Sequence, residues 1–231
     1  MAKSEIAIVL CSGGLDSVVT AHYVKKRLDY RKIIVLFFDY GQKNLLKEEE
    51  FSRETSKIIG GEFFKIKLPG LKDLSDSLIN SQGDAEKIEN LKNTKKESDK
   101  FYVPCRNTIF LSYALALAES LYIREGKVSD IFVGFKSEGK EPFPDATPDF
   151  LKKLNSLSEV SCAMPFKVIA PFIEKDKEDL IRAGEGMGLD FEKTFSCYVG
   201  KENHCGTCLA CRLRQEGFKW AGIKDPTKYL E

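Results

Sequence analysis

The sequence of 231 residues contains no apolar run approaching the roughly 18 residues that are needed to span a membrane. The N-terminus also lacks a long apolar segment after a basic start, so we expect no secretory signal. Basic residues are not in excess, because 36 Lys and Arg stand against 35 Asp and Glu. Proteins that bind nucleic acids usually carry an excess of positive charge. We therefore expect a cytoplasmic protein that contacts no membrane and binds no nucleic acid directly.

Two common phosphate-binding loops are absent as well, since the sequence has neither a Gly-Lys-Ser/Thr step nor a Gly-x-Gly-x-x-Gly run. Instead, the apolar segment Ile6–Leu10 leads through Cys11 into Ser-Gly-Gly-Leu-Asp-Ser. The glycines let the backbone approach an oxyanion, and a following helix would point its N-terminal N–H groups at it. The predicted phosphate loop comprises Ser12, Gly13, Gly14, Leu15, Asp16 and Ser17.

The polar side chains of this loop suit ATP. The hydroxyl groups of Ser12 and Ser17 can bind phosphate oxygens, and Asp16 can hold the Mg²⁺ ion that accompanies the nucleotide. The alternative is a plain strand–turn–helix unit in which Asp16 or Ser17 only caps the helix.

Short apolar runs alternate with helical patterns along most of the chain, which is typical of a parallel sheet with helices on both faces. The predicted strands are Ile6–Leu10, Ile33–Phe38, Phe63–Leu68, Ile131–Val133 and Ile169–Pro171. The predicted helices are 16–28, 45–59, 107–124, 149–157 and 175–187. Segment 81–100 is charged and lacks apolar periodicity, so we expect a mobile surface loop there. The predicted fold class is a doubly wound, mostly parallel α/β sheet.

Ligands of such sheets bind beyond the carboxyl ends of the strands. Ser12, Asp39 and Gly134 each come at or just after the end of a predicted strand, so we expect them to share one rim. Asp39 is therefore a further candidate for nucleotide binding.

Four of the seven cysteines are clustered near the C-terminus as Cys-x7-Cys-x2-Cys-x2-Cys. They are Cys197, Cys205, Cys208 and Cys211. Four thiolates complete a tetrahedral zinc site without an open position, which indicates a structural Zn²⁺ ion. Unligated buried thiols and an iron–sulfur cluster are the alternatives. We predict an ATP-binding α/β domain over residues 1–190 and a small zinc-binding subdomain over 191–231.

Neighbouring residues add to this interpretation. His204 is a further potential ligand, and Arg212 and Arg214 are placed to stabilise thiolate charge. Cys11, Cys105 and Cys162 have no obvious partner, which fits a reducing compartment better than a disulfide framework. We expect Cys11 in the core.

The strand and loop at Ile6–Ser17 resemble the pyrophosphate loop of the N-type ATP pyrophosphatases, which cleave ATP between the α- and β-phosphates. Further stretches resemble one branch of that superfamily, the 7-cyano-7-deazaguanine synthases of queuosine and archaeosine precursor synthesis. These stretches are DYGQK (Asp39–Lys43), VPCRN (Val103–Asn107), FPD (Phe143–Asp145), Lys177 and the run Glu192–Phe218. The resemblance covers nearly the whole chain in order. Its most specific part joins the clustered cysteines to Thr-x-Ser-Cys-Tyr.

The resemblance implies an ATP-dependent carbon–nitrogen ligase that converts 7-carboxy-7-deazaguanine and ammonia to 7-cyano-7-deazaguanine. In the first round the carboxylate is adenylated and ammonia displaces AMP, which gives an amide. In the second round the amide oxygen is adenylated, and loss of AMP leaves the nitrile. The implied cofactors are ATP, Mg²⁺ and Zn²⁺, and the implied assembly is a homodimer.

The resemblance also implies roles for individual residues. The catalytic candidates are Asp16, Arg106 and Lys177. The candidates for substrate binding are Tyr40, Gln42, Arg106, Asn107, Phe143 and Asp145. The alternative for Arg106 and Lys177 is that they are ordinary surface charges.

The sequence departs from the family pattern at two places. Lys43 and Asn44 stand where an Arg-His pair is usual, and Ala146 and Thr147 stand where the family has Cys and Arg. Lys43, Lys136 or Lys140 could supply the missing charge. An alternative function follows from these departures, namely a specialised paralogue from an antiviral gene cluster that adenylates and amidates a related carboxylate.

Two further alternatives come from other functional classes. One is a zinc-stabilised module that binds protein or nucleic acid and keeps a relic ATP loop. The balanced charge and the retention of both Asp16 and Ser17 argue against it. The other is tRNA thiolation, for which only Cys11 and Cys105 could provide the reactive thiols.

Overall fold

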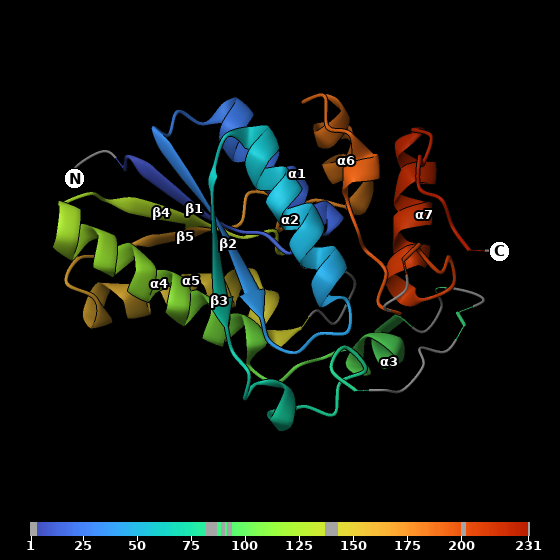
Figure 1. Cartoon of the computed structure of the whole chain (residues 1–231), viewed down its shortest axis with the longest axis horizontal. Helices are drawn as coiled ribbons and strands as arrows, with labels where there is room; N and C mark the ends of the chain where they lie inside the picture. Colours follow the sequence, from blue (N-terminus) through green and yellow to red (C-terminus); the bar gives the residue numbers. More distant parts are fainter. Residues whose placement is uncertain are drawn as a thin grey trace.

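The computed structural model describes residues 4–81, 87–88, 91, 94–136, 143–199 and 202–230. Its centre is a five-stranded sheet with the order β3-β2-β1-β4-β5, in which every neighbouring pair is parallel (Figure 1). The strands are β1 (Ile6–Leu10), β2 (Lys32–Asp39), β3 (Glu62–Lys67), β4 (Ser129–Phe132) and β5 (Lys167–Ile169). The chain places β1 at the centre and builds outward on both sides, which confirms the doubly wound α/β class.

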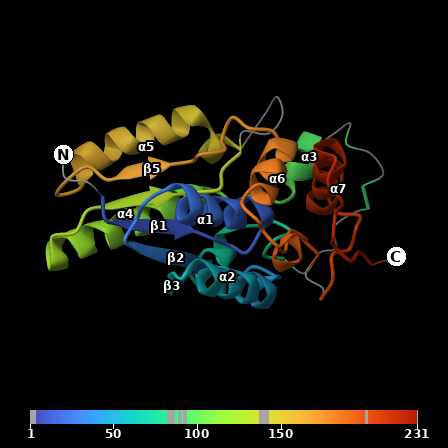
Figure 2. The same cartoon turned by 90° about the horizontal axis from the view of Figure 1, so that it is seen from above.

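Helices cover both faces of this sheet (Figure 2). The longer helices are α1 (Leu15–Arg27), α2 (Leu45–Ile59), α4 (Arg106–Glu125), α5 (Pro148–Ser161), α6 (Lys177–Glu185) and α7 (Leu209–Ala221). Successive side chains of a strand point to opposite faces. Accordingly, Ile6 and Ile8 of β1 pack in the core formed with α4 and α5, whereas Ala7 and Val9 pack in the core formed with α1 and α6.

Several predictions of secondary structure need correction. The last strand is shifted, because β5 ends at Ile169, where the predicted strand Ile169–Pro171 begins. The stretch 81–100 is not all loop, because α3 (Thr94–Asp99) lies in its described part. Helix α5 continues to Ser161, four residues beyond its predicted end, because Leu154 and Ser158 are still buried. Helix α7 was not predicted at all, although it packs against α6 at the edge of the molecule (Figure 1).

The carboxyl ends of the strands form one rim, as expected. Ser12 follows β1, Asp39 ends β2, and Gly134 follows β4. The chain enters α1 directly from β1 and α2 directly from β2, so the N-terminal ends of both helices face this rim (Figure 2). In the described part of the chain, no helix combines the length and the apolar character that crossing a membrane requires.

Candidate active site and metal centre

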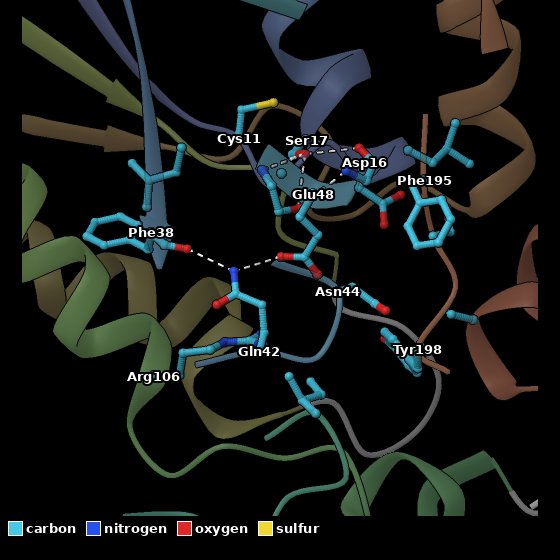
Figure 3. A pocket seen from close by; sticks show the side chains of 18 of the residues that line it. Cys11, Asp16, Ser17, Phe38, Gln42, Asn44, Glu48, Arg106, Phe195 and Tyr198 are labelled. Carbon is cyan, nitrogen blue, oxygen red and sulfur yellow. Dashed lines mark hydrogen bonds between the residues drawn. The ribbon is translucent and has the colours of Figure 1, made fainter. Parts of the chain in front are cut away.

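A cavity of about 330 Å³ lies at the rim of the sheet (Figure 3). Its walls come from the phosphate loop, the segment after β2, the start of α4, the first residue of α6 and the segment 195–198. The predicted site residues that line it are Ser12, Gly14, Leu15, Asp16, Ser17, Tyr40, Gln42, Arg106, Asn107, Phe143 and Lys177. The fold therefore brings most of the predicted nucleotide-binding and substrate-binding residues to one space, and Gly13, Asp39 and Asp145 are the exceptions.

The phosphate loop is held open by short-range hydrogen bonds. The Ser12 amide donates to Ser17 Oγ at 3.2 Å, and Ser17 Oγ donates to the Gly14 carbonyl at 2.9 Å. Gly13 has φ +78°, and a Cβ there would lie 2.8 Å from the Glu48 carbonyl oxygen, so only glycine fits. The N-cap of α1 is Gly14 without a side-chain hydrogen bond. Neither Asp16 nor Ser17 therefore serves as the helix cap.

Asp16 and Lys177 form an ion pair across the cavity mouth. Lys177 Nζ lies 2.9 Å from both carboxylate oxygens of Asp16, and the lysine side chain is only 15% exposed. Gly134 backs this arrangement, because a Cβ at Gly134 would lie 2.8 Å from the Ser17 amide nitrogen. Lys177 is thus a cation of the phosphate site and not a solvated surface charge.

Helix α7 presses on the stem of this lysine. A Cβ built on Gly217 would lie 2.4 Å from Lys177 Cγ and 3.0 Å from Ile181 Cδ1. The side chain of Lys177 therefore runs over a bare stretch of the α7 backbone on its way to Asp16. Sequence reasoning missed this contact, because it joins residues 40 positions apart through a helix that was not predicted.

At the opposite end of the cavity, Gln42 organises the segment after β2. Its Oε1 accepts from the Tyr40 amide at 2.9 Å, and its Nε2 donates to the Phe38 carbonyl at 2.9 Å. The same Nε2 donates to Glu48 Oε2 at 3.0 Å, which Figure 3 shows. Gln42 thus uses both ends of its amide within the protein. It shapes the cavity wall and holds Glu48 in place.

Arg106 begins α4 and lies beside the ring of Tyr40. Its Nη1 donates to Tyr40 Oη at 3.4 Å, and its guanidinium carbon lies 5.9 Å from the ring centroid. Burial raises the pKa of Tyr40 to about 12, so the phenol stays protonated. Arg106 is therefore a cation of the cavity wall, and the surface-charge alternative does not hold for it.

Asn107 and Asp145 fix the start of α4 to the segment before α5. The Asn107 amide donates to Asp145 Oδ2 at 3.1 Å, and Asn107 Nδ2 donates to the Asp145 carbonyl at 3.2 Å. Phe143 stacks on Tyr102 with a centroid separation of 5.4 Å. Asn107 and Phe143 line the cavity, whereas Asp145 stands behind Asn107. Asp145 therefore acts on the cavity through its neighbour.

Asp39 is a predicted nucleotide-binding residue that does not line the cavity. Its Oδ2 pairs with Lys65 Nζ at 3.2 Å, and it is not among the residues that line the cavity. Lys65 also pairs with Glu49 at 2.6 Å. In this structure Asp39 therefore belongs to an ion-pair network at the neighbouring strand, although it ends a strand on the same rim.

The residues that depart from the family pattern have structural roles of their own. Asn44 is 7% exposed, lines the cavity and donates from Nδ2 to the Cys197 carbonyl. Thr147 is the N-cap of α5, and its Oγ1 accepts from the Phe150 amide at 3.1 Å. Lys43 lines the cavity, and Lys140 lies outside the described residues. Lys136, the third lysine considered, is not among the residues that line the cavity.

The four clustered cysteines meet, as predicted. Their Sγ atoms all lie within 4.8 Å of one another, and Cys205 Sγ lies 3.9 Å from Cys211 Sγ. Four thiolates about 2.3 Å from a central zinc ion would be about 3.8 Å apart, so the cluster has the size of a tetrahedral site. Backbone N–H groups point at the sulfurs, for example the Cys208 amide at 3.2 Å from Cys205 Sγ. Such donors favour the thiolate form that a metal requires.

The residues around the cluster also hold the neighbouring chain segments. His204 Nε2 accepts from the Ser196 amide at 3.0 Å, and burial lowers the pKa of His204 to about 4, so it is a neutral structural acceptor. Arg214 is 1% exposed and donates to Thr194 Oγ1 at 2.7 Å. Arg212 donates to the Ile88 carbonyl at 3.0 Å. The hydrogen bonds of both arginines thus bind chain segments together, and the charge of Arg214 also interacts with Cys211.

The cysteine cluster and the cavity share a wall. Cys197 and the residues beside it line the cavity, including Phe195 and Tyr198. The Phe195 amide donates to the Gly13 carbonyl at 2.9 Å, so the phosphate loop is tied directly to this segment. The ring of Tyr198 packs on Phe101 at a centroid distance of 4.6 Å. The cysteine cluster therefore supports one side of the cavity.

Comparison with known proteins finds a family model and relatives that match nearly the whole chain. The family model described as "Queuosine biosynthesis protein QueC" matches residues 6–222. A 7-cyano-7-deazaguanine synthase of Methanothermobacter thermautotrophicus is 36% identical over 97% of this chain and 99% of that protein. The enzyme of the same name from a Nitratiruptor species is 36% identical over 96% of this chain and 98% of that protein. Among solved structures, a 4-thiouridine synthetase with RNA and ATP has a TM-score of 0.49 and 17% identity, over 94% of this chain and 50% of that one.

Proposed function

The chain belongs to the queuosine biosynthesis protein QueC family, and on that premise we propose that it converts 7-carboxy-7-deazaguanine, ammonia and ATP to 7-cyano-7-deazaguanine. The observation that carries the proposal is the single cavity in which a phosphate loop faces a pocket lined by Tyr40, Arg106 and Phe143. Aromatic rings and a guanidinium suit a flat heterocycle that bears a carboxylate.

In the first round, a carboxylate oxygen attacks the α-phosphorus of ATP, and pyrophosphate leaves. Backbone N–H groups of the phosphate loop and the hydroxyl of Ser12 hold the phosphate oxygens, while the Ser17 hydroxyl donates to the Gly14 carbonyl and keeps the loop in shape. Lys177 neutralises the charge that develops on them, and Arg106 orients the carboxylate. Ammonia then attacks the adenylated carbon, the bond to the AMP oxygen breaks, and an amide remains.

In the second round, the amide oxygen attacks a second ATP in the same way. Its departure with AMP, together with the loss of both N–H protons, leaves a carbon–nitrogen triple bond. One cavity suffices for both rounds, because the attacking oxygen occupies the same place relative to the phosphate loop each time. The protein contributes position and charge neutralisation rather than covalent chemistry.

The residues present also fit the proposed metals. Asp16 is the carboxylate of the phosphate loop, and its side chain is 32% exposed at the cavity mouth. A Mg²⁺ ion held there with ATP would supply charge neutralisation for the leaving pyrophosphate. Zn²⁺ at the four cysteines would have a structural role only, because four thiolates leave no position for substrate.

The test is incubation of the protein with ATP, Mg²⁺, ammonium and 7-carboxy-7-deazaguanine, followed by mass spectrometry of the base and measurement of pyrophosphate. We expect the nitrile and two pyrophosphates per nitrile. The Asp16→Asn variant is the negative control. Absence of pyrophosphate release from the wild type with this acid would exclude the proposed substrate.

A second candidate function is favoured by the two departures from the family pattern. Asn44 Oδ1 is a buried acceptor without a hydrogen-bond partner among the described residues, and it belongs to a residue that lines the cavity. A usual histidine there would offer a different polar group. In this alternative, a paralogue adenylates and amidates a related carboxylate. If the amide accumulates and no nitrile forms, the same mass spectra would support the alternative.

A further inference from the structure

Glu48 is a carboxylate in the cavity to which the preceding mechanism gives no task. It lies in the first turn of α2, and its side chain lines the cavity between the phosphate loop and Gln42 (Figure 3). Two contacts place Glu48 next to the phosphate loop and next to Gln42. The Glu48 carbonyl oxygen lies 2.8 Å from the position of a Cβ on Gly13, and Glu48 Oε2 accepts from Gln42 Nε2 at 3.0 Å. Glu48 therefore stands where the phosphate end meets the substrate end.

The carboxylate of Glu48 is held by a hydrogen bond to one of its two oxygens. Oε2 is held by Gln42, whose amide is fixed in turn by Phe38 and Tyr40. Among the described residues, that hydrogen bond is the one that the carboxylate accepts, so Oε1 remains available to a ligand. A held carboxylate with one open oxygen is the arrangement that a proton acceptor needs.

The reaction contains proton transfers that Asp16, Arg106 and Lys177 do not serve. Attack by ammonia gives a tetrahedral adduct with a positively charged nitrogen, which must lose a proton before AMP leaves with the electron pair of the C–O bond. In the second round the adenylated amide loses both N–H protons as the C–O bond breaks and the triple bond forms. Arg106 and Lys177 are cations, and Asp16 is engaged by Lys177.

Resting on the proposed function, we propose that Glu48 is the catalytic base that accepts these protons from the substrate nitrogen. Each accepted proton passes to solvent before the next transfer. The same carboxylate serves both rounds, because the nitrogen is attached to the same carbon in each. Ionised Glu48 also attracts the ammonium ion, from which the ammonia nucleophile arises.

The surroundings of Glu48 suit this task. Burial raises its pKa to about 7, while Gln42 and the charge of Arg106 act in the opposite direction. Tyr40 is the other titratable group that faces it, and Asp16, Lys43 and Lys177 also line the cavity. A general base works best when its pKa lies near the working pH.

The decisive experiment separates adenylation from proton transfer. Exchange of labelled pyrophosphate into ATP, driven by 7-carboxy-7-deazaguanine without ammonia, needs no N–H proton transfer. Conversion of the amide, 7-amido-7-deazaguanine, to the nitrile needs it and uses no ammonia. We expect Glu48→Gln to keep the exchange rate within about threefold and to lower nitrile formation by at least about 10²-fold. Glu50→Gln, an exposed carboxylate on the same helix, is the matched control and should change neither.

The pH profile of nitrile formation identifies the group. The wild-type rate should rise with pH through about 7, as Glu48 ionises. The rise should persist at a reduced rate in Glu48→Asp and disappear in Glu48→Gln. Unchanged nitrile formation in Glu48→Gln would overturn the role, and an equal loss of exchange and nitrile formation would assign Glu48 to binding or folding instead. If the wild type shows no pyrophosphate exchange with either 7-carboxy-7-deazaguanine or 7-amido-7-deazaguanine, the proposed function is wrong. The role of Glu48 is then withdrawn with it.

Discussion

Replacement of Gly217 by alanine tests whether α7 positions the lysine of the phosphate site. The new Cβ would lie 2.4 Å from Lys177 Cγ and 3.2 Å from Lys177 Cβ, so it meets the stem of the side chain near its root. The flexible end of a lysine can move aside, but its root cannot without displacing Nζ. We therefore expect the pair between Lys177 and Asp16, now 2.9 Å, to be broken.

The expected effect on stability is small because two terms oppose each other. An alanine in a helix interior is favoured over glycine by about 1 kcal/mol. Overpacking of a tight contact costs about 1–3 kcal/mol. The net loss should therefore stay below about 2 kcal/mol, and the protein should remain folded. The effect on catalysis should be larger, because one preorganised charged group is worth about 10²-fold or more in rate.

The assay is pyrophosphate exchange, with urea unfolding measured on the same samples. Gly217→Ala should lower exchange at least about tenfold. Gly186→Ala, at the end of α6, is the matched control, since its Cβ would approach Arg182 O no closer than 3.4 Å. Gly217→Ala and Lys177→Met, singly and combined, form a double-mutant cycle. If Gly217→Ala lowers exchange as much in the Lys177→Met background as in the wild type, it does not act through the lysine.

Four other changes have definite expected outcomes. Asp16→Asn should lower pyrophosphate exchange by at least about 10²-fold with an unchanged melting curve, because a charge of the phosphate site is lost. Cys208→Ala should release about one zinc per chain by metal analysis and destabilise the fold, because metal binding is coupled to folding. Glu48→Gln should stabilise the protein by up to about 3 kcal/mol above pH 7 and not at pH 4.5, as measured by urea unfolding. The sign follows from a folded-state pKa of about 7 against 4.5, which makes the wild type lose stability as pH rises between these values. Thr147→Arg should cost about 1 kcal/mol through the lost cap of α5, whatever its effect on turnover.

The sheet and the phosphate loop could be predicted because their signals are local. Each buried strand is a short apolar run, and the loop is a contiguous segment whose glycines and hydroxyls have few other uses. The cysteine cluster is nearly as local, since three of its four ligands lie within the span Cys205–Cys211. Such features depend little on what the rest of the chain does.

Glu48 could not be predicted, because its selection depends on packing. It is one of three consecutive glutamates, Glu48–Glu50, in a helix whose composition suggests a solvated face. Glu49 pairs with Lys65 and Arg53 outside the cavity, and Glu50 is exposed. The first turn of α2 packs against Gly13 and Glu48 accepts from Gln42, and the contact with Gly13 joins residues far apart in the sequence.

Helix α7 escaped prediction for a related reason. Its first residues belong to the cysteine cluster, with Cys208 as the N-cap and Cys211 in the first turn, so their spacing reads as a metal motif. Its apolar side is small, and the fully buried side chain of Arg214 interrupts it. The helix is specified by what it touches, and those partners lie in other parts of the chain.

These long-range contacts connect the cysteine cluster to the cavity, so a metal bound at the cluster would affect the proposed reaction without taking part in it. The segment that carries Cys197 also donates the Phe195 amide to Gly13, and its carbonyl accepts from Asn44 at the start of α2. Helix α7, which the metal would anchor at its first turn, supports Lys177 through Gly217. The phosphate loop, the start of α2 and Lys177 thus all depend on one cysteine cluster that lies far from them in the sequence. Loss of metal should therefore displace the phosphate loop and its lysine together, whereas loss of either contact alone would displace only one of them.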